Sequence, residues 1–403
     1  MWSVIHLIPA HQGRPADDPI FALNREAMAR RAKGESIVNA TLGTLLDDEG
    51  KLVVLPSTAR AVKEVPDELW ASYAPIAGDP DFLRAVMDDF LSPAPELRAC
   101  AIAQATPGGS GALRHAIANY LELGQSLLTT SYFWGPYQTL ADEADRKLVT
   151  FSMFTKDGAL DVTALGDALT AQIEKEGRAL LFLNDPCQNP TGYSMRPSEW
   201  DAVVKSLLLQ ADRAPVTLLV DVAYYAYGKG ERGAFLKSLT PLLGKVGLLF
   251  AWSASKTFTH YGLRVGALIA CVPDAKERAM TEAALSYSSR GTWSNCSHGG
   301  LRAVTRLLTD PEIARACDRE REVYKNLLLA RVDAFNALAP ARGLLYPRYE
   351  GGFFVTVFSG DAKTKSAQMR EAGVYVVPTG GALRVGLCSV ATRDIPKLVD
   401  ALA

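Results

Sequence analysis

The sequence predicts an α/β fold built on a mostly parallel sheet. Short apolar runs alternate with Ala-rich helical patterns along much of the chain. Three of these runs, residues 179–183, 216–220 and 246–252, each stop at a polar or turn residue. Runs of this length are typical of strands buried on both faces. Helices between such strands indicate right-handed crossovers within one sheet.

The size and charge of the chain limit the kinds of protein that it can be. At 403 residues it has room for two or three domains of about 150 residues each. Hydrophobic residues make up 48% and charged residues 22%, which excludes a disordered chain. The net charge of −1 argues against nucleic acid as a partner. No uncharged apolar run approaches about 18 residues, so no membrane partner is expected.

The cysteines and the leading residues predict a compartment. The six cysteines are dispersed and form no C-x-x-C pair, which favours free thiols in a reducing compartment and no metal site. Residues 1–12 lack both a positively charged start and a small-residue cleavage pattern, so no signal peptide is expected. The prediction is a cytoplasmic protein.

Further elements follow in chain order. A helix is predicted over residues 112–123, after a small-residue loop at 107–111. A long helical stretch is predicted over residues 301–339, broken at Pro311 and ended by Pro340. Strand-like segments follow at 353–358, 374–377 and 382–387, which indicates a smaller α+β portion.

Polar side chains follow three of the predicted strands where each strand ends. Asn184 and Asp185 lead into Asn189, Asp221 ends the next strand, and Ser253 to Lys256 follow the third. Taken alone, Asp221 is typical of a cap and Lys256 of a solvated lysine. Ligands of open parallel sheets bind beyond the carboxyl ends of the strands. The joint placement therefore predicts a site at this edge.

A lysine, an acid and small hydroxyl residues together suit pyridoxal phosphate. This cofactor needs an amine for a Schiff base and an acid facing its pyridinium nitrogen, which Lys256 and Asp221 supply. It also needs amides, hydroxyls and a cation around its phosphate. Residues 108–111, Ser253 and Arg264 supply those, and Trp134 offers an aromatic face.

The residues around this lysine resemble a known family. Residues 253–258, Ser-Ala-Ser-Lys-Thr-Phe, and 261–266, Tyr-Gly-Leu-Arg-Val-Gly, are similar to the lysine signature of class I aminotransferases. These are the fold-type I pyridoxal-phosphate enzymes typified by aspartate aminotransferase, and the likeness covers nearly the whole chain. It implies a seven-stranded, mostly parallel sheet in a large domain, residues 50–320. A small domain, residues 321–403, would be joined by the N-terminal segment, residues 1–49.

The resemblance also implies roles at the reacting end of the cofactor. Lys256 would form the internal aldimine and then move the α-proton of the substrate. Asp221 would hold the ring nitrogen protonated. Asn189 and Tyr224 would hydrogen-bond the phenolic oxygen of the ring.

At the phosphate end, the resemblance implies that Gly109 and Ser110 bind through backbone amides and a hydroxyl. Ser253 and Arg264 would complete this cup, and Trp134 would stack on the ring. Residues 73–78, Tyr-Ala-Pro-Ile-Ala-Gly, resemble the segment that reaches the neighbouring subunit's cofactor. Tyr73 would therefore act across a homodimer.

Two arginines match substrate-binding positions of the family. Arg384 matches the arginine that binds the α-carboxylate, a task that suits its planar fork. Arg290 matches the arginine that binds the distal carboxylate of aspartate or glutamate across the dimer. Gly43 would lie over the substrate.

The expected activity is transfer of an amino group between an L-amino acid and a 2-oxo acid such as 2-oxoglutarate. The amino acid would be aspartate, glutamate or an aromatic one. Three departures from aspartate-specific relatives leave this choice open. Tyr137 and Asn184 stand where relatives often have histidines, and Cys296-Ser297 replaces a pair of prolines. A C–S β-lyase or another fold-type I reaction is the alternative.

Overall fold

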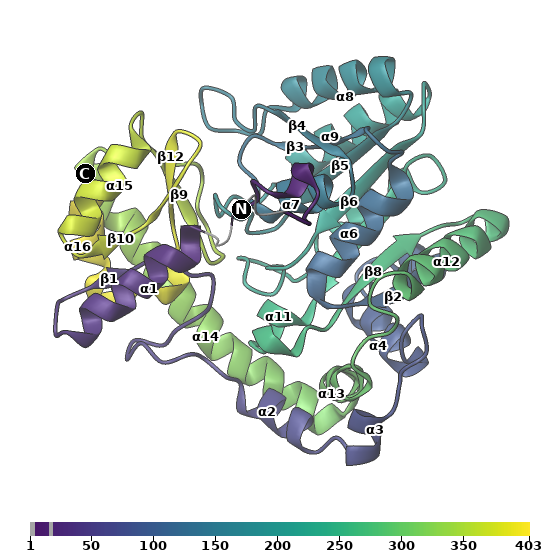
Figure 1. The fold of residues 1–403 in the computed structure, drawn as a ribbon, viewed down its shortest axis with the longest axis horizontal. Coiled ribbons are helices and arrows are strands. Elements are labelled where there is room, and N and C mark those ends of the chain that lie inside the picture. The colour runs from purple at the N-terminus through teal and green to yellow at the C-terminus, as the bar shows by residue number, and fades with distance from the viewer. Residues whose placement is uncertain (1–4, 16–18) are drawn as a thin grey trace.

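The computed structural model describes residues 5–15 and 19–403, so the first four residues of the leading stretch lie outside it. Within these residues, seven strands form one sheet in the order β2-β8-β7-β6-β5-β3-β4 (Figure 1). The strands are β2 (Ala101–Thr106), β3 (Ser126–Thr130), β4 (Lys147–Phe151), β5 (Ala179–Asn184), β6 (Val216–Asp221), β7 (Gly247–Ser253) and β8 (Gly266–Cys271). Only β8 runs antiparallel to its neighbours, so the predicted mostly parallel sheet is confirmed.

Helices cover both faces of this sheet (Figure 1). The helices of the described residues, in both bodies of the chain, are α1 (Pro19–Ala32), α2 (Pro56–Lys63), α3 (Asp67–Ala71), α4 (Pro80–Phe90), α5 (Pro95–Ala99), α6 (Gly108–Tyr120), α7 (Pro136–Glu143), α8 (Val162–Glu176), α9 (Pro197–Ala211), α10 (Leu236–Leu239), α11 (Ala254–Thr257), α12 (Ala275–Arg290), α13 (His298–Thr309), α14 (Pro311–Leu338), α15 (Ala362–Glu371) and α16 (Ile395–Leu402).

The side chains of β5 show why its sequence is apolar throughout. Leu181 and Leu183 pack with α4, α8 and α9 on one face. Leu180 and Phe182 pack with α6, α7 and α12 on the other. Successive strand residues point to opposite faces, so a strand covered on both sides needs an unbroken apolar run.

A second, smaller body contains the C-terminal strands. Strands β9 (Val355–Phe358), β11 (Val377–Thr379) and β12 (Ala382–Val385) form an antiparallel sheet, while β1 (Val38–Asn39) pairs with β10 (Val374–Tyr375). Their apolar side chains form a separate core with α14 and α16. The part of the N-terminal segment that holds α1 and β1 therefore lies with the C-terminal portion. The predicted boundary at residue 320 falls within α14, a continuous helix, and the division into domains stays a prediction.

Two predicted boundaries are wrong. The small-residue loop at 107–111 is not a loop, because α6 begins at Gly108 and these residues form its first turn. The same helix ends at Tyr120, not at residue 123. The stretch 301–339 forms two helices, α13 and α14, which meet at Asp310 and Pro311 as expected from the proline.

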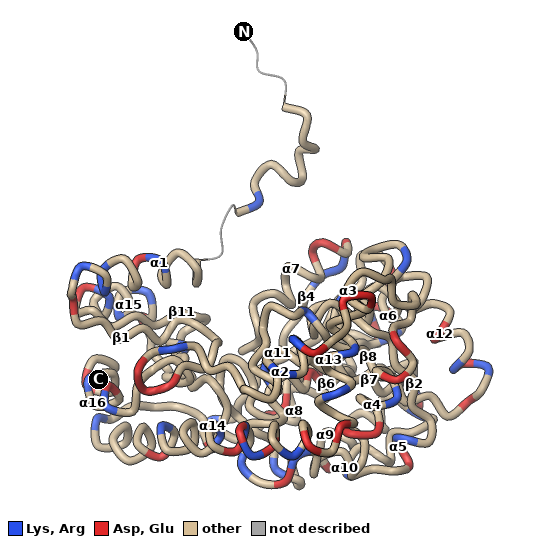
Figure 2. The backbone as a smooth tube through the Cα atoms, turned by 90° about the horizontal axis from the view of Figure 1, so that it is seen from below, with Lys and Arg blue, Asp and Glu red and all other residues tan. Residues whose placement is uncertain are grey.

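Residues 5–15 lead away from both bodies in Figure 2. Arg14 in this segment forms an ion pair with Glu143 of α7. Among the described helices, none combines the length and the apolar character that crossing a bilayer requires.

Candidate active site

The predicted strand-end site is present in the sheet. Strand β6 lies between β5 and β7, and Asp221 pairs with Asn184 on one side and Ala251 on the other. All three strands are parallel, so their carboxyl ends meet at one edge. Lys256 follows β7 directly, in the short helix α11.

A cavity of roughly 150 Å³ opens at this edge. Nine of the predicted residues line it: Gly109, Ser110, Trp134, Asn189, Asp221, Tyr224, Ser253, Lys256 and Arg264. Five further lining residues are Leu113, Asn184, Ala223, Ser255 and Tyr261. Ser255 and Tyr261 flank the lysine in the motif that carried the resemblance, so that motif could have indicated them.

Asp221 is the buried acid of the cavity. Its carboxylate accepts hydrogen bonds from Tyr137 Oη at 2.7 Å and from the Ala223 backbone N–H at 3.1 Å. Burial raises its pKa to about 6, although the Tyr137 hydrogen bond lowers it. A cation facing this carboxylate would favour its ionised form.

Lys256 is the buried amine of the cavity. Its Nζ donates to the Gly43 carbonyl at 3.1 Å and lies 4.6 Å from the centre of the Tyr261 ring. Burial lowers its pKa to about 8, and Arg264 and Arg384 add to this effect. A larger share of the amine is therefore neutral and nucleophilic near pH 8 than for an ordinary lysine.

The opposite end of the cavity is built to bind an anion. The helix α6 begins there, and its first backbone N–H groups have no partner within the helix. A Cβ at Gly109 would lie 3.5 Å from Ser253 Cβ, so a side chain at that position would enter the space between them. Arg264 completes this end, where its guanidinium donates to Ser255 Oγ at 3.2 Å and to the Pro107 carbonyl at 3.3 Å.

Two amide side chains fix the loop after β5. Asn184 Nδ2 donates to the Asp221 carbonyl at 2.7 Å, and Asn184 Oδ1 accepts from the Asn189 N–H at 2.7 Å. Asn189 Nδ2 lies 3.5 Å from Tyr224 Oη. Asn184 thus contacts the backbone of Asp221 and not its carboxylate.

Arg384 and Gly43 both lie close to the ring of Phe354. Arg384 on β12 is 7% exposed, and its Nη2 donates to the Thr41 carbonyl at 2.5 Å. Its guanidinium lies 4.7 Å from the centre of the Phe354 ring. A Cβ at Gly43 would come within 2.8 Å of the same ring, so the position needs glycine. No sequence pattern indicated Phe354.

Gly43 and Arg384 do not themselves line this cavity, and two further predicted residues, Tyr73 and Arg290, do not line it either. The Tyr73 side chain is 87% exposed, and the residue pairs with Ser297 in an isolated antiparallel bridge. Arg290 is exposed at the end of α12, where its Nη1 lies 2.6 Å from Ser294 Oγ. Their predicted roles across a dimer stay predictions.

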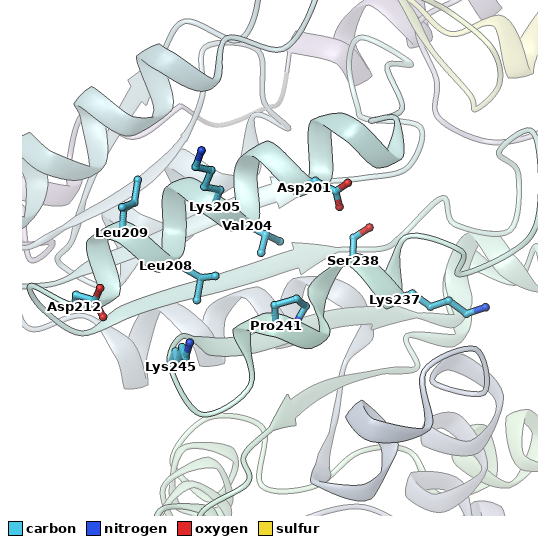
Figure 3. A pocket seen from close by; sticks show the side chains of 10 residues that line it. All are labelled: Asp201, Val204, Lys205, Leu208, Leu209, Asp212, Lys237, Ser238, Pro241 and Lys245. Carbon is cyan, nitrogen blue, oxygen red and sulfur yellow. The ribbon is translucent and has the colours of Figure 1, made fainter.

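A larger hollow lies elsewhere, between α9 and the segment that holds α10. It has a volume of roughly 680 Å³ and is shown in Figure 3. Its floor is apolar, with Val204, Leu208 and Pro241, and Lys237 and Lys245 stand at its edge. It combines no buried acid with a buried amine, so the strand-end cavity is the candidate active site.

The groups that line the strand-end cavity fit pyridoxal phosphate. A helix start, two serine hydroxyls and a guanidinium suit a phosphate at one end. A buried carboxylate and a buried amine of lowered pKa stand at the other. Trp134, at the wall between them, has the flat face that stacking on a ring requires.

Comparisons with known proteins give the same result. A family model described as aminotransferase class I and II matches residues 35–402. An aromatic-amino-acid aminotransferase of Pseudomonas aeruginosa is 29% identical, with 98% of each chain covered. An aspartate aminotransferase of that organism is 25% identical, over 90% of this chain and 91% of the relative.

Comparison with solved structures also gives aminotransferases. An aminotransferase from Anaerococcus prevotii has a TM-score of 0.93 and 33% identity, with 99% of this chain and 98% of that chain covered. The fold is also that of an aromatic-amino-acid aminotransferase from Burkholderia pseudomallei, described as covalently bound to pyridoxal phosphate. That match has a TM-score of 0.81 and 23% identity over 98% of this chain and 99% of that chain.

Proposed function

We propose that this chain, which belongs to the class I and II aminotransferases, acts on dicarboxylic and aromatic L-amino acids. It is a pyridoxal-phosphate-dependent aminotransferase of fold type I. The amino group would pass from aspartate, glutamate or an aromatic amino acid to a 2-oxo acid such as 2-oxoglutarate. The relatives reported above are named for aromatic amino acids and for aspartate. None of these observations favours the C–S lyase alternative.

The observation that carries this proposal is the pairing of Lys256 and Asp221 in one buried cavity with an anion-binding end. When bound, pyridoxal phosphate supplies a reactive aldehyde and an electron-withdrawing ring. Lys256 Nζ, with its pKa lowered to about 8, is suited to accept and return a proton near neutral pH. Asp221 would keep its carboxylate toward the ring nitrogen, oriented by Tyr137 and the Ala223 N–H.

The other lining residues would bind and orient the cofactor. Gly109, Ser110, Ser253 and Arg264 would bind the phosphate, since they surround the start of α6. Asn189 and Tyr224, 3.5 Å apart, would donate to the phenolic oxygen. Trp134 would stack on the ring.

The substrate would be bound by its carboxylates. Arg384 lies on β12 of the smaller body, and the N–H groups of its planar fork would donate to the α-carboxylate. Gly43, packed against the Phe354 ring, would lie over the substrate. Arg290 would bind the distal carboxylate of aspartate or glutamate, and it would yield that place to an aromatic ring.

The catalytic unit would be a homodimer in the cytoplasm. Tyr73 and Arg290 are exposed on the described surface and do not line this chain's own cavity, which supports roles in a partner's site. Residues 1–49 with 321–403 would move as a small domain against residues 50–320 and exclude water. All six cysteines are free thiols, which supports a reducing compartment.

The test is a screen of single amino acids against the purified, cofactor-loaded protein. Each amino acid is mixed with the protein, and conversion of the cofactor to its aminated form is followed by absorbance. Glutamate is expected to convert it, together with aspartate or an aromatic amino acid. If the spectrum stays unchanged with every dicarboxylic and aromatic amino acid, the proposed substrate class is wrong.

A further inference from the structure

Three buried polar side chains meet beneath the turn that carries Arg290. Gln104 lies on β2, His115 on α6, and Ser289 is the last residue but one of α12. Ser289 Oγ is 2.9 Å from Gln104 Nε2 and 2.9 Å from His115 Nε2. None of the three side chains is more than 2% exposed. The cluster therefore exchanges no hydrogen bonds with bulk water.

A histidine is an unusual residue at the buried position 115. Burial lowers its pKa to about 4, so the imidazole is neutral at physiological pH. Its ring lies against the Trp293 ring, with centroids 4.4 Å apart. Among the described residues, its Nδ1 has no hydrogen-bond partner. A buried polar atom without a partner costs free energy, and an apolar side chain would fill the space without that cost. The Ser289 contact thus needs a reason beyond packing.

Ser289 anchors the Arg290 turn. Its carbonyl accepts from the backbone N–H groups of Thr292 at 3.2 Å and Ser294 at 2.9 Å. Ser294 has a positive φ of 69° and lies 2.6 Å from the Arg290 guanidinium. The position of Ser289 therefore determines where the turn, and with it the Arg290 side chain, is placed.

Gln104 ties a second segment to the same cluster. Its Nε2 also donates to the Ile76 carbonyl at 2.8 Å, in the segment that carries Tyr73. The two segments with proposed roles in the partner's site, near Tyr73 and Arg290, are thus both bonded to one buried amide.

We propose that His115 and Ser289 are positioning residues that place Arg290 for the distal carboxylate of a dicarboxylic ligand. This rests on the proposed function, in which Arg290 binds that carboxylate. Because both residues act through Arg290, their loss should weaken the binding of dicarboxylic ligands. The binding of ligands with a single carboxylate should remain almost unchanged.

The test measures binding, not turnover. Full-length, cofactor-loaded protein is titrated by calorimetry with glutarate, which has two carboxylates, and with 3-phenylpropionate, which has one. The variants are Ser289→Ala and His115→Phe. The second variant removes the hydrogen bond but keeps a ring against Trp293. Ser286→Ala is the matched control, because it removes a hydroxyl from the same helix, 3.4 Å from Gln104 Oε1.

Ser289→Ala and His115→Phe are each expected to weaken glutarate binding by roughly three- to tenfold, and 3-phenylpropionate by less than about twofold. The double variant should be no weaker than Ser289→Ala, since the two residues act through one hydrogen bond. Ser286→Ala should bind both ligands as the parent protein does. Equal losses for the two ligands, or unchanged glutarate binding, would overturn the proposal.

Arg290→Ala separates the two hypotheses. If Arg290→Ala selectively weakens glutarate binding and Ser289→Ala does not, the positioning role of Ser289 and His115 is wrong. The dicarboxylate role of Arg290 is then supported. If Arg290→Ala leaves glutarate binding unchanged, the dicarboxylate role of Arg290 is wrong, and the positioning proposal is overturned with it.

Discussion

Tyr137 donates a hydrogen bond of 2.7 Å from its phenol oxygen to Asp221 Oδ2, and both side chains are buried. The phenol stays neutral, because burial and the nearby carboxylate hold the pKa of Tyr137 well above its usual value. The acid that is proposed to face the cofactor nitrogen therefore has a hydrogen-bond donor that carries no charge. An imidazole at this position would titrate near neutral pH.

Tyr137→Phe should weaken binding of pyridoxal phosphate by about tenfold or more, because a hydrogen bond to a charged group is worth about 1.5–3 kcal/mol. Phenylalanine keeps the ring that packs on Phe182. Affinity is measured by titrating cofactor-free protein. Tyr225→Phe is the control, since it also removes a buried hydroxyl near a carboxylate, Asp89, but does not line the cavity. Similar affinity losses in both variants would contradict a specific role for Tyr137.

Lys256→Ala should abolish turnover and the long-wavelength absorbance of the loaded protein, because it removes the amine that is proposed to react with the cofactor. Lys245→Ala, an exposed lysine of the other hollow, should change neither. The measurements are an absorbance spectrum and a transamination assay with glutamate. An active Lys256→Ala protein with an intact spectrum would refute the assignment.

Asp221 should make the cofactor-free protein less stable as pH rises. Its folded pKa of about 6 lies above the ordinary value of 3.8, so the folded state keeps a proton that the unfolded state loses between these values. Stability therefore falls as pH increases through this window and stays lower above pH 6.

Asp221→Asn removes this pH dependence. From pH 4 to pH 8, its free energy of unfolding should improve relative to the parent by about 2 kcal/mol. Urea denaturation of both cofactor-free proteins at the two pH values provides the measurement. The same substitution should weaken cofactor binding at pH 8. Parallel pH dependence of the two proteins would contradict the prediction.

Gly43→Ala should displace Phe354, because its Cβ would come within 2.8 Å of that ring. Phe354 is 1% exposed and packs beneath Arg384, so it has little room to move. Overpacking of this kind costs about 1–3 kcal/mol. The KM for amino acids should rise several-fold while cofactor affinity changes little. Gly262→Ala, where a Cβ meets nothing within 4 Å, should leave both values unchanged.

Local patterns predicted the sheet and most of the cavity. The strands at 179–183, 216–220 and 246–252 each lie within one residue of β5, β6 and β7, because burial on both faces leaves an unbroken apolar run. Asp221 and Lys256 were predicted to lie close together, because the carboxyl ends of parallel strands meet at one edge of the sheet. The start of α6 was missed, because small residues at 108–111 are typical of both a loop and a helix start.

The fold class, the strand ends and the residue types that suit pyridoxal phosphate could all be predicted from the sequence, since these depend on short-range periodicity and on one contiguous motif. Which distant residues meet could be learned from the folded chain alone. Tyr137 and Asp221 are 84 positions apart, and His115 and Ser289 are 174 apart. Contacts of this range depend on how helices pack across the sheet, and no local pattern records that packing.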